Sequence, residues 1–127
     1  MVSFLEIVYY ESNRAGLDPN LVVGLIKTES NFRKYSISSA NARGYMQVMP
    51  FWLKEMGHPS DNLFDTKTNI RYGCTILRHY IDNEKGNLFF ALGSYNGSRG
   101  SAIYPMQVLL SWNTIAKKEQ NMRIARN

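Results

Sequence analysis

An acidic residue follows the most apolar stretch of this chain. The stretch occupies residues 21–26 and continues through a lysine and a threonine to Glu29. The pair Asp18-Pro19 precedes it, and a capping acid followed by proline at the first helical position is a helix start signal. On a helix, Glu29 lies one turn after Leu25 and shares its inward face. The segment therefore predicts a buried helix from residue 19 to about residue 30, with an acid on its inner face.

The expected burial of Glu29 has a chemical consequence. Burial penalises the charged form of a carboxyl group, so the pKa of Glu29 should be raised. A carboxylic acid that is still protonated near neutral pH can act as a general acid. A glutamate at a helix end can also turn out to water or pair with a basic residue, and helical spacing alone leaves both interpretations open.

Helical signals continue along the chain. Ser3 and Glu6 have capping-box spacing, and their helix should end near Gly16. The other expected helices are a short one over Phe51–Met56, one capped by Asp65 and ended by Gly86, a buried one that begins at Asn87, and a last one that follows Pro105. Residues 31–48 show no sustained period and could hold a short β-hairpin.

Length and charge limit the possible classes of protein. With 127 residues and no repeat or linker, we expect a single domain over residues 1–127. No apolar stretch could span a bilayer, and the first residues lack the features of a signal peptide. The net charge of +5 suits an anionic partner, but the basic residues form no stripe with interleaved aromatics, which disfavours a nucleic-acid binder. The single cysteine, Cys74, excludes an internal disulfide, and its spacing indicates a core position.

Three short segments stand apart from this helical pattern. They are Glu29-Ser30, the run Gly-Tyr-Met-Gln-Val-Met-Pro at residues 44–50, and the run Ser-Tyr-Asn-Gly-Ser at residues 94–98. Together and in this order, they resemble the soluble lytic transglycosylase family, whose goose-type-lysozyme-like domain cuts bacterial peptidoglycan. The resemblance covers roughly residues 18–100. It implies a mainly α, lysozyme-like domain of about five to seven helices, with a small irregular or β element near residues 35–48.

The resemblance also implies roles for individual residues. Glu29 matches the only catalytic carboxylate of the family. Five further positions match residues that surround the acid and the sugars: Ser38, Gln47, Met49, Tyr95 and Asn96. Among them, Tyr95 matches the tyrosine that points its hydroxyl at the acid. Tyr45 is a further candidate for substrate binding, because its ring could cover an apolar sugar face. Asn69 and Gly73 match a pattern that we interpret as structural, and Gly73 is expected to let another backbone approach its helix closely. On spacing alone, Tyr95 is a buried tyrosine bonded to backbone, Ser38 is a turn serine and Met49 is a core residue.

Local departures from the family pattern remove none of these chemical groups. Tyr45 replaces the usual leucine, Ser94 the usual alanine, and Asn41 a common glycine. Gly97-Ser98 stands where the family often has alanine-glycine. These substitutions bear on substrate preference more than on activity.

The reaction that the resemblance implies needs a single carboxylate. Most glycosidases use two, but no second acid of this chain shows a motif that would pair it with Glu29; Glu11, for example, is expected on a solvated face. In a lytic transglycosylase, the 6-hydroxyl of N-acetylmuramic acid attacks its own C1 and gives a 1,6-anhydro product. One glutamate then serves first as acid and afterwards as base. No metal and no cofactor are expected, since His58 and His79 are isolated.

Two other interpretations remain open beside the transglycosylase. One is a hydrolytic lysozyme on the same fold, and the other is a catalytically silent glycan-binding module of a cell-envelope assembly. The expected partner is peptidoglycan, with cell-envelope or secretion-apparatus proteins as further candidates, and a monomer is expected. The implied location is the periplasm or cell envelope of a bacterium.

Overall fold

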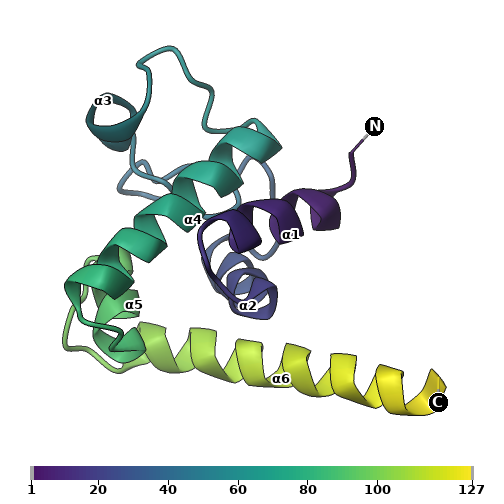
Figure 1. The fold of residues 1–127 in the computed structure, drawn as a ribbon. Helices are drawn as coiled ribbons and strands as arrows, with labels where there is room; N and C mark the ends of the chain where they lie inside the picture. The colour runs from purple at the N-terminus through teal and green to yellow at the C-terminus, as the bar shows by residue number, and fades with distance from the viewer. Residues whose placement is uncertain (1, 127) are drawn as a thin grey trace.

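The computed structural model describes residues 2–126, which form six helices joined by loops (Figure 1). The helices are α1 (Phe4–Arg14), α2 (Pro19–Ser30), α3 (Trp52–Met56), α4 (Thr66–Asn83), α5 (Leu88–Asn96) and α6 (Ile103–Arg126). The expectation of a mainly α domain with five to seven helices is confirmed. None of the helices between residues 2 and 126 combines the length and apolar character needed to cross a bilayer.

The predicted capping residues begin their helices. Ser3 Oγ accepts from the Glu6 amide at 3.2 Å, and Asp18 Oδ1 accepts from the Asn20 amide at 2.8 Å. Asp65 caps α4 and Asn87 caps α5 in the same way. Each bond satisfies a backbone N–H that has no partner within its own helix. These four helix starts agree with the sequence.

The central helix α2 packs against α6, which runs along one side of the molecule and extends past it towards the C-terminus (Figure 1). The two helices approach closely at Gly24, where a Cβ atom would lie 2.9 Å from the backbone nitrogen of Trp112. On the other side, α4 packs against α1 and α5. The core that these helices enclose includes Val22, Leu25 and Ile26 of α2.

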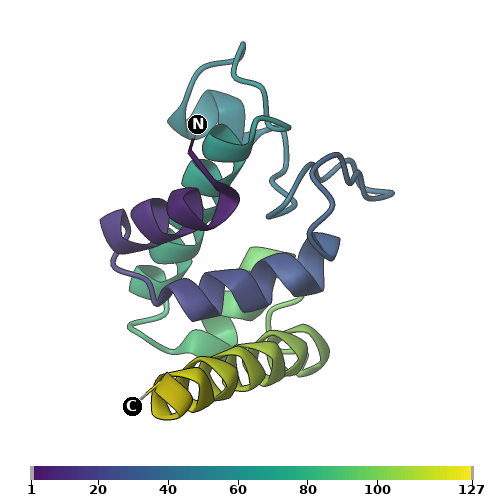
Figure 2. The ribbon, with the colours of Figure 1, turned by 90° about the vertical axis from the view of Figure 1, so that its right-hand side faces the viewer.

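The segment between α2 and α3 is nearly free of regular structure, as its composition predicts. Two isolated β-bridges, Ile37 with Arg43 and Arg43 with Val48, are its only strand-like contacts within residues 2–126. Figure 2 shows this segment standing out beyond the C-terminal end of α2. The expected small β element is therefore reduced to these bridges.

Two expectations about helices are wrong. The last helix begins at Ile103, before Pro105, because a proline in the first turn removes only an N–H that would have no helical partner. Gly73 of α4 does not admit another backbone. It admits the side chain of Met46, whose sulfur would lie 2.3 Å from a Cβ atom at this position.

The expectation that Glu11 faces solvent is also wrong. Its side chain is 0% exposed, because α1 turns this face towards α4. Its Oε1 accepts from Arg14 Nε at 2.7 Å, and Arg14 Nη2 donates to Thr75 Oγ1 of α4 at 2.7 Å. The buried acid is thus part of a polar link between α1 and α4.

Candidate functional site

Glu29 lies in the last turn of α2, with its side chain half-buried. Burial raises the pKa of Glu29 from its ordinary value of 4.5 to about 7, and a hydrogen bond from Tyr104 acts in the opposite direction. No other carboxylate among residues 2–126 contributes to this shift. The group is therefore divided between its acid and base forms near neutral pH, as the apolar surroundings in the sequence predict.

The tyrosine that contacts Glu29 comes from the first turn of α6. Tyr104 Oη donates to Glu29 Oε2 at 2.8 Å, and the side chain of Tyr104 is only 6% exposed. Burial, followed by the charge of Glu29, raises the pKa of Tyr104 well above its usual range, so the phenol stays protonated and remains a donor. Sequence reasoning missed this residue, because nothing in the sequence near Tyr104 links it to an acid that lies 75 positions away.

Tyr95 occupies a neighbouring position with a different partner. Its hydroxyl donates to the backbone oxygen of Met46 at 2.6 Å, so the bond to Glu29 that the resemblance implied is made by Tyr104 instead. Burial, followed by the charge of Glu29, raises the pKa of Tyr95 well above its usual range. Tyr95 therefore lies close enough to feel the acid, while its hydrogen bond holds the segment that contains Met46.

Three further bonds fix residues 44–49 beside the acid. Ser30, next to Glu29, donates from Oγ to the Tyr45 backbone oxygen at 2.8 Å. From α4, Asn69 accepts at Oδ1 from the Met46 amide at 2.8 Å and donates from Nδ2 to the Arg43 oxygen at 2.9 Å. Asn69 is fully buried. Its structural role agrees with the interpretation from the sequence.

Gln47 and Met49 lie on this segment with their side chains half-buried. Gln47 has a positive φ of 53°, and its Nε2 donates to the backbone oxygens of Ser36 at 3.1 Å and Gly44 at 3.0 Å. The amide nitrogen thus supports the loop. The amide oxygen of Gln47 accepts no hydrogen bond from residues 2–126, so it is the end of this side chain that could meet a ligand.

The three remaining predicted residues make contacts of their own. The ring of Tyr45 packs on Phe4 of α1, with the centroids 4.8 Å apart. Ser38 Oγ accepts from the Ala42 amide at 3.0 Å, and Asn96 Nδ2 donates to Ser98 Oγ at 2.8 Å. No hydrogen bond joins any of these three side chains to Glu29 within the described part of the chain. Ser30 and Tyr95 bond the backbone oxygens of the segment beside Glu29, whereas the side chains of Ser38 and Asn96 stabilise turns.

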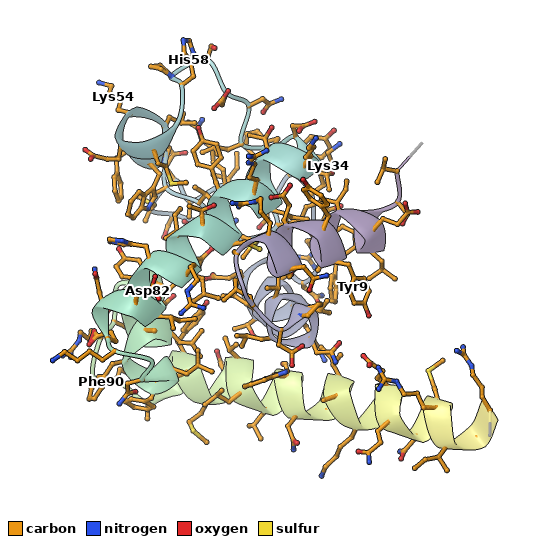
Figure 3. All side chains as sticks on the ribbon, viewed as in Figure 1. Tyr9, Lys34, Lys54, His58, Asp82 and Phe90 are labelled. Carbon is orange, nitrogen blue, oxygen red and sulfur yellow. The ribbon has the colours of Figure 1, made fainter. Side chains whose placement is uncertain are left out.

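The turn that delivers Tyr104 is held by an ion pair. Arg99 lies between α5 and α6 and contacts both oxygens of Glu84, with Nε to Oε2 at 2.6 Å and Nη2 to Oε1 at 2.9 Å. Its guanidinium also lies 4.4 Å from the ring centroid of Phe90, which Figure 3 labels at the end of the molecule where α4 passes into α5. This clamp fixes the path of the chain into α6.

Metal ligation finds no support in the described residues. Residues 2–126 contain no cluster of three or more histidine, cysteine or acidic side chains that could hold an ion. His79 lies exposed on α4, with Asn83 Nδ2 at 3.2 Å from its Nε2. Cys74 is buried in the core, and burial raises the pKa of its thiol to about 12.

Comparison with known proteins gives consistent results. The family model described as the transglycosylase SLT domain matches residues 6–107. The membrane-bound lytic murein transglycosylase C of Mannheimia succiniciproducens is 36% identical over 79% of this chain, and that of Haemophilus influenzae is 34% identical over the same share. The match covers 32% of each of these relatives, so the chain spans about a third of their length.

Solved structures show the same fold. The lytic transglycosylase Slt of Pseudomonas aeruginosa, determined as an inactive mutant, superposes with a TM-score of 0.77 at 20% identity, over 89% of this chain and 24% of the other. The 70 kDa soluble lytic transglycosylase of Escherichia coli gives a TM-score of 0.65 at 21% identity, over 87% of this chain and 18% of the other. The expected lysozyme-like architecture is thereby confirmed.

Proposed function

The chain belongs to the transglycosylase SLT domain family, and from this premise we propose that it is a peptidoglycan lytic transglycosylase. It cleaves the β-1,4 bond between N-acetylmuramic acid and N-acetylglucosamine and forms 1,6-anhydro-N-acetylmuramic acid. The observation that carries the proposal is Glu29, half-buried with a pKa of about 7 and held by the hydroxyl of Tyr104. A group with this pKa can give and take a proton at neutral pH.

The first step uses Glu29 as the acid. Because Tyr104 donates to Oε2, the proton of the neutral acid resides on Oε1. That proton passes to the glycosidic oxygen while the bond from this oxygen to C1 of the muramic acid breaks, and positive charge develops at C1. Glu29 is left as a carboxylate, whose charge the Tyr104 hydrogen bond stabilises.

The second step uses Glu29 as the base. Its Oε1 takes the proton of the 6-hydroxyl of the same muramic acid, and the oxygen of that hydroxyl forms the new bond to C1. The acid is thereby restored, and no water enters the products. One carboxylate is sufficient for both steps.

The other residues of the site have supporting roles in this proposal. Tyr95 keeps the segment 44–49 against the acid through Met46. The amide oxygen of Gln47 accepts a hydrogen bond from the N–H of an acetamido group, and Met49 and Tyr45 cover apolar sugar faces. Ser38 and Asn96 contact the glycan strand of the substrate from the turns that they stabilise.

The biological setting is also part of the proposal. The relatives named above are described as membrane-bound and as acting on murein. We place this chain in the cell envelope of a bacterium, with peptidoglycan strands as its partner and other envelope or secretion-apparatus proteins as further candidates.

Replacing Glu29 by glutamine tests the function directly. Wild-type protein incubated with purified peptidoglycan should release anhydro-ended fragments, which mass spectrometry separates from reducing-ended fragments by one water. Glu29→Gln should bind the same material and reduce the release at least about 1,000-fold, because it can no longer transfer a proton. Reducing ends from wild type would indicate a hydrolase instead, and equal, zero release from both proteins would indicate a glycan-binding module.

A further inference from the structure

Positive charge is concentrated in the segment that follows Glu29. Between Glu29 and Glu55 the chain has no acidic residue, but it carries the basic residues Arg33, Lys34, Arg43 and Lys54. Residues 30–54 therefore carry a net charge of +4, which no acid of the same stretch offsets. Lys54 belongs to α3 and projects away from the body of the molecule (Figure 3). The other three lie on residues 31–43, which we name the basic loop.

The basic loop is joined to the segment that lines the acid. Arg43 forms β-bridges to both Ile37 and Val48, so the loop lies alongside residues 44–48. The ring of Phe32 contacts Phe4 at a centroid distance of 6.3 Å, and Phe4 in turn packs on Tyr45. The basic loop thus extends the wall formed by residues 44–49 outward, away from Glu29.

Within residues 2–126, none of the three cations of the basic loop forms an ion pair with a carboxylate. The ion pairs of the described residues involve Arg14, Arg78, Arg99 and Arg123. Lys34 lies 5.4 Å from the ring centroid of Tyr35, and Arg43 lies 6.0 Å from that of Phe64. Lys34 also helps to hold the pKa of Asp65 below its usual range, but Asp65 is engaged as the cap of α4. The loop therefore offers unneutralised charge to a ligand.

Exposed apolar side chains lie on the same loop as these cations. Tyr35 is 70% exposed, and Ile37 and Phe32 are exposed as well. A surface of this kind fits a ligand that carries carboxylates separated by short apolar groups. A sugar ring alone offers neither feature.

We propose that the basic loop binds the stem peptides of peptidoglycan through their carboxylates. The proposal rests on the proposed function, because it names which form of that substrate the site prefers. Stem peptides carry several carboxylates and the methyl groups of alanine residues, and they extend away from the glycan. The lactyl carboxylate of a peptide-free strand stays next to its ring and offers a single charge.

The test compares two substrates and three proteins. The substrates are purified sacculi and the same sacculi stripped of stem peptides by an N-acetylmuramoyl-L-alanine amidase. The proteins are wild type, the triple variant R33Q/K34Q/R43Q, and the control K117Q/K118Q/R126Q. The control makes the same change in charge at exposed positions of α6. Matched thermal unfolding curves establish that both variants are folded.

Wild type should release anhydro fragments from intact sacculi about five- to tenfold faster than from stripped sacculi at low ionic strength, which corresponds to a few weak surface pairs. The triple variant should lose this advantage on intact sacculi and keep the wild-type rate on stripped ones, while the control behaves as wild type on both. The proposal is overturned if the triple variant matches wild type on intact sacculi, if it slows equally on both substrates, or if the control slows as much.

A binding measurement keeps the two proposals distinguishable. If wild type releases no anhydro fragment from either substrate, the proposed function fails. Calorimetry then tests separately whether the basic loop binds stem peptides. A soluble disaccharide-tetrapeptide should then bind wild type about fivefold or more tighter than it binds the triple variant, and the peptide-free disaccharide should not discriminate between them. Equal affinities of the disaccharide-tetrapeptide for the two proteins would overturn the proposal.

Discussion

The hydroxyl of Tyr104 determines which oxygen of Glu29 carries the proton. A carboxylic acid has two equivalent oxygens in water, and a fixed donor at one of them leaves the proton to the other. Here the donor lies 2.8 Å from Oε2. The hydrogen bond also favours the charged form of Glu29 and so opposes the effect of burial. The same contact therefore orients the acid and limits how far its pKa rises.

Replacing Tyr104 by phenylalanine tests both effects. Loss of the hydrogen bond should raise the pKa of Glu29 by about one unit above its present value of about 7, because a bond to a charged group contributes about 1.5 kcal/mol or more. Turnover should fall about tenfold, and the alkaline limb of its pH profile should move to higher pH with the acid. Carbon-13 NMR titration of the Glu29 carboxyl group measures the pKa without relying on activity.

Tyr95→Phe is the matched control for this titration. The Tyr95 hydroxyl bonds to the Met46 oxygen and not to the acid, so its loss should leave the pKa of Glu29 within about 0.3 units of wild type. If Tyr95→Phe moves that pKa as far as Tyr104→Phe does, the assignment of Tyr104 as the residue that orients the acid is wrong.

At the scale of elements, α4 holds the wall beside the acid through one buried amide. Asn69 bonds the Met46 amide and the oxygens of Arg43 and Leu63, and thereby joins two loops to a helix. The chain has no sheet at this place to satisfy these backbone groups. A single, fully buried side chain does so instead, and its bonds to the Met46 amide and the Leu63 oxygen are shielded from water.

Asn69→Ala should therefore destabilise the protein by about 3 kcal/mol or more, because it leaves several buried backbone groups unpaired. Denaturant titration measures this loss. Asn83→Ala is the control on the same helix. Its side chain is exposed and its amide forms a hydrogen bond with His79, so the change should stay within about 0.5 kcal/mol. Similar losses in the two variants would contradict the structural role of Asn69.

At the scale of the whole molecule, the sequence predicts what depends on near neighbours. The caps at Ser3, Asp18 and Asp65 bond to amides two or three residues away, so their patterns are local and the helix starts could be predicted. The apolar residues within one turn of Glu29 predict that it lies on an inward face, and burial raises its pKa. The resemblance to the family predicts in addition that Glu29, Tyr95 and residues 44–50 belong to one site.

The contacts that could not be predicted join residues far apart in the chain. Tyr104 meets Glu29 only because α6 packs along α2, and Glu11 is buried only because α4 covers α1. Likewise, Gly73 accommodates a side chain of another segment, which helical spacing alone does not specify. Packing between helices depends on the complete fold, and no local pattern contains it.

Keeping Glu29 partly protonated has a consequence for the stability of the whole protein. Its folded-state pKa of about 7 lies above the ordinary value of 4.5, so between these values the unfolded chain releases a proton that the folded protein retains. Rising pH then favours the unfolded state. The stabilisation that comes from retaining this proton is fully present below about pH 4.5 and is lost above about pH 7. The lowered pKa values of Asp61, Asp65 and Glu84 act in the opposite sense, at lower pH.

Comparison with Glu29→Gln isolates this contribution, because both proteins share all the other acids. The free energy of unfolding of wild type, relative to that of Glu29→Gln, should fall by about 3 kcal/mol as the pH rises from 4.5 to 8. Urea titrations at five or six pH values within this range measure the difference. A difference that stays constant with pH would mean that Glu29 is ionised at its ordinary pKa, and the acid would then lack the proton that the proposed first step requires.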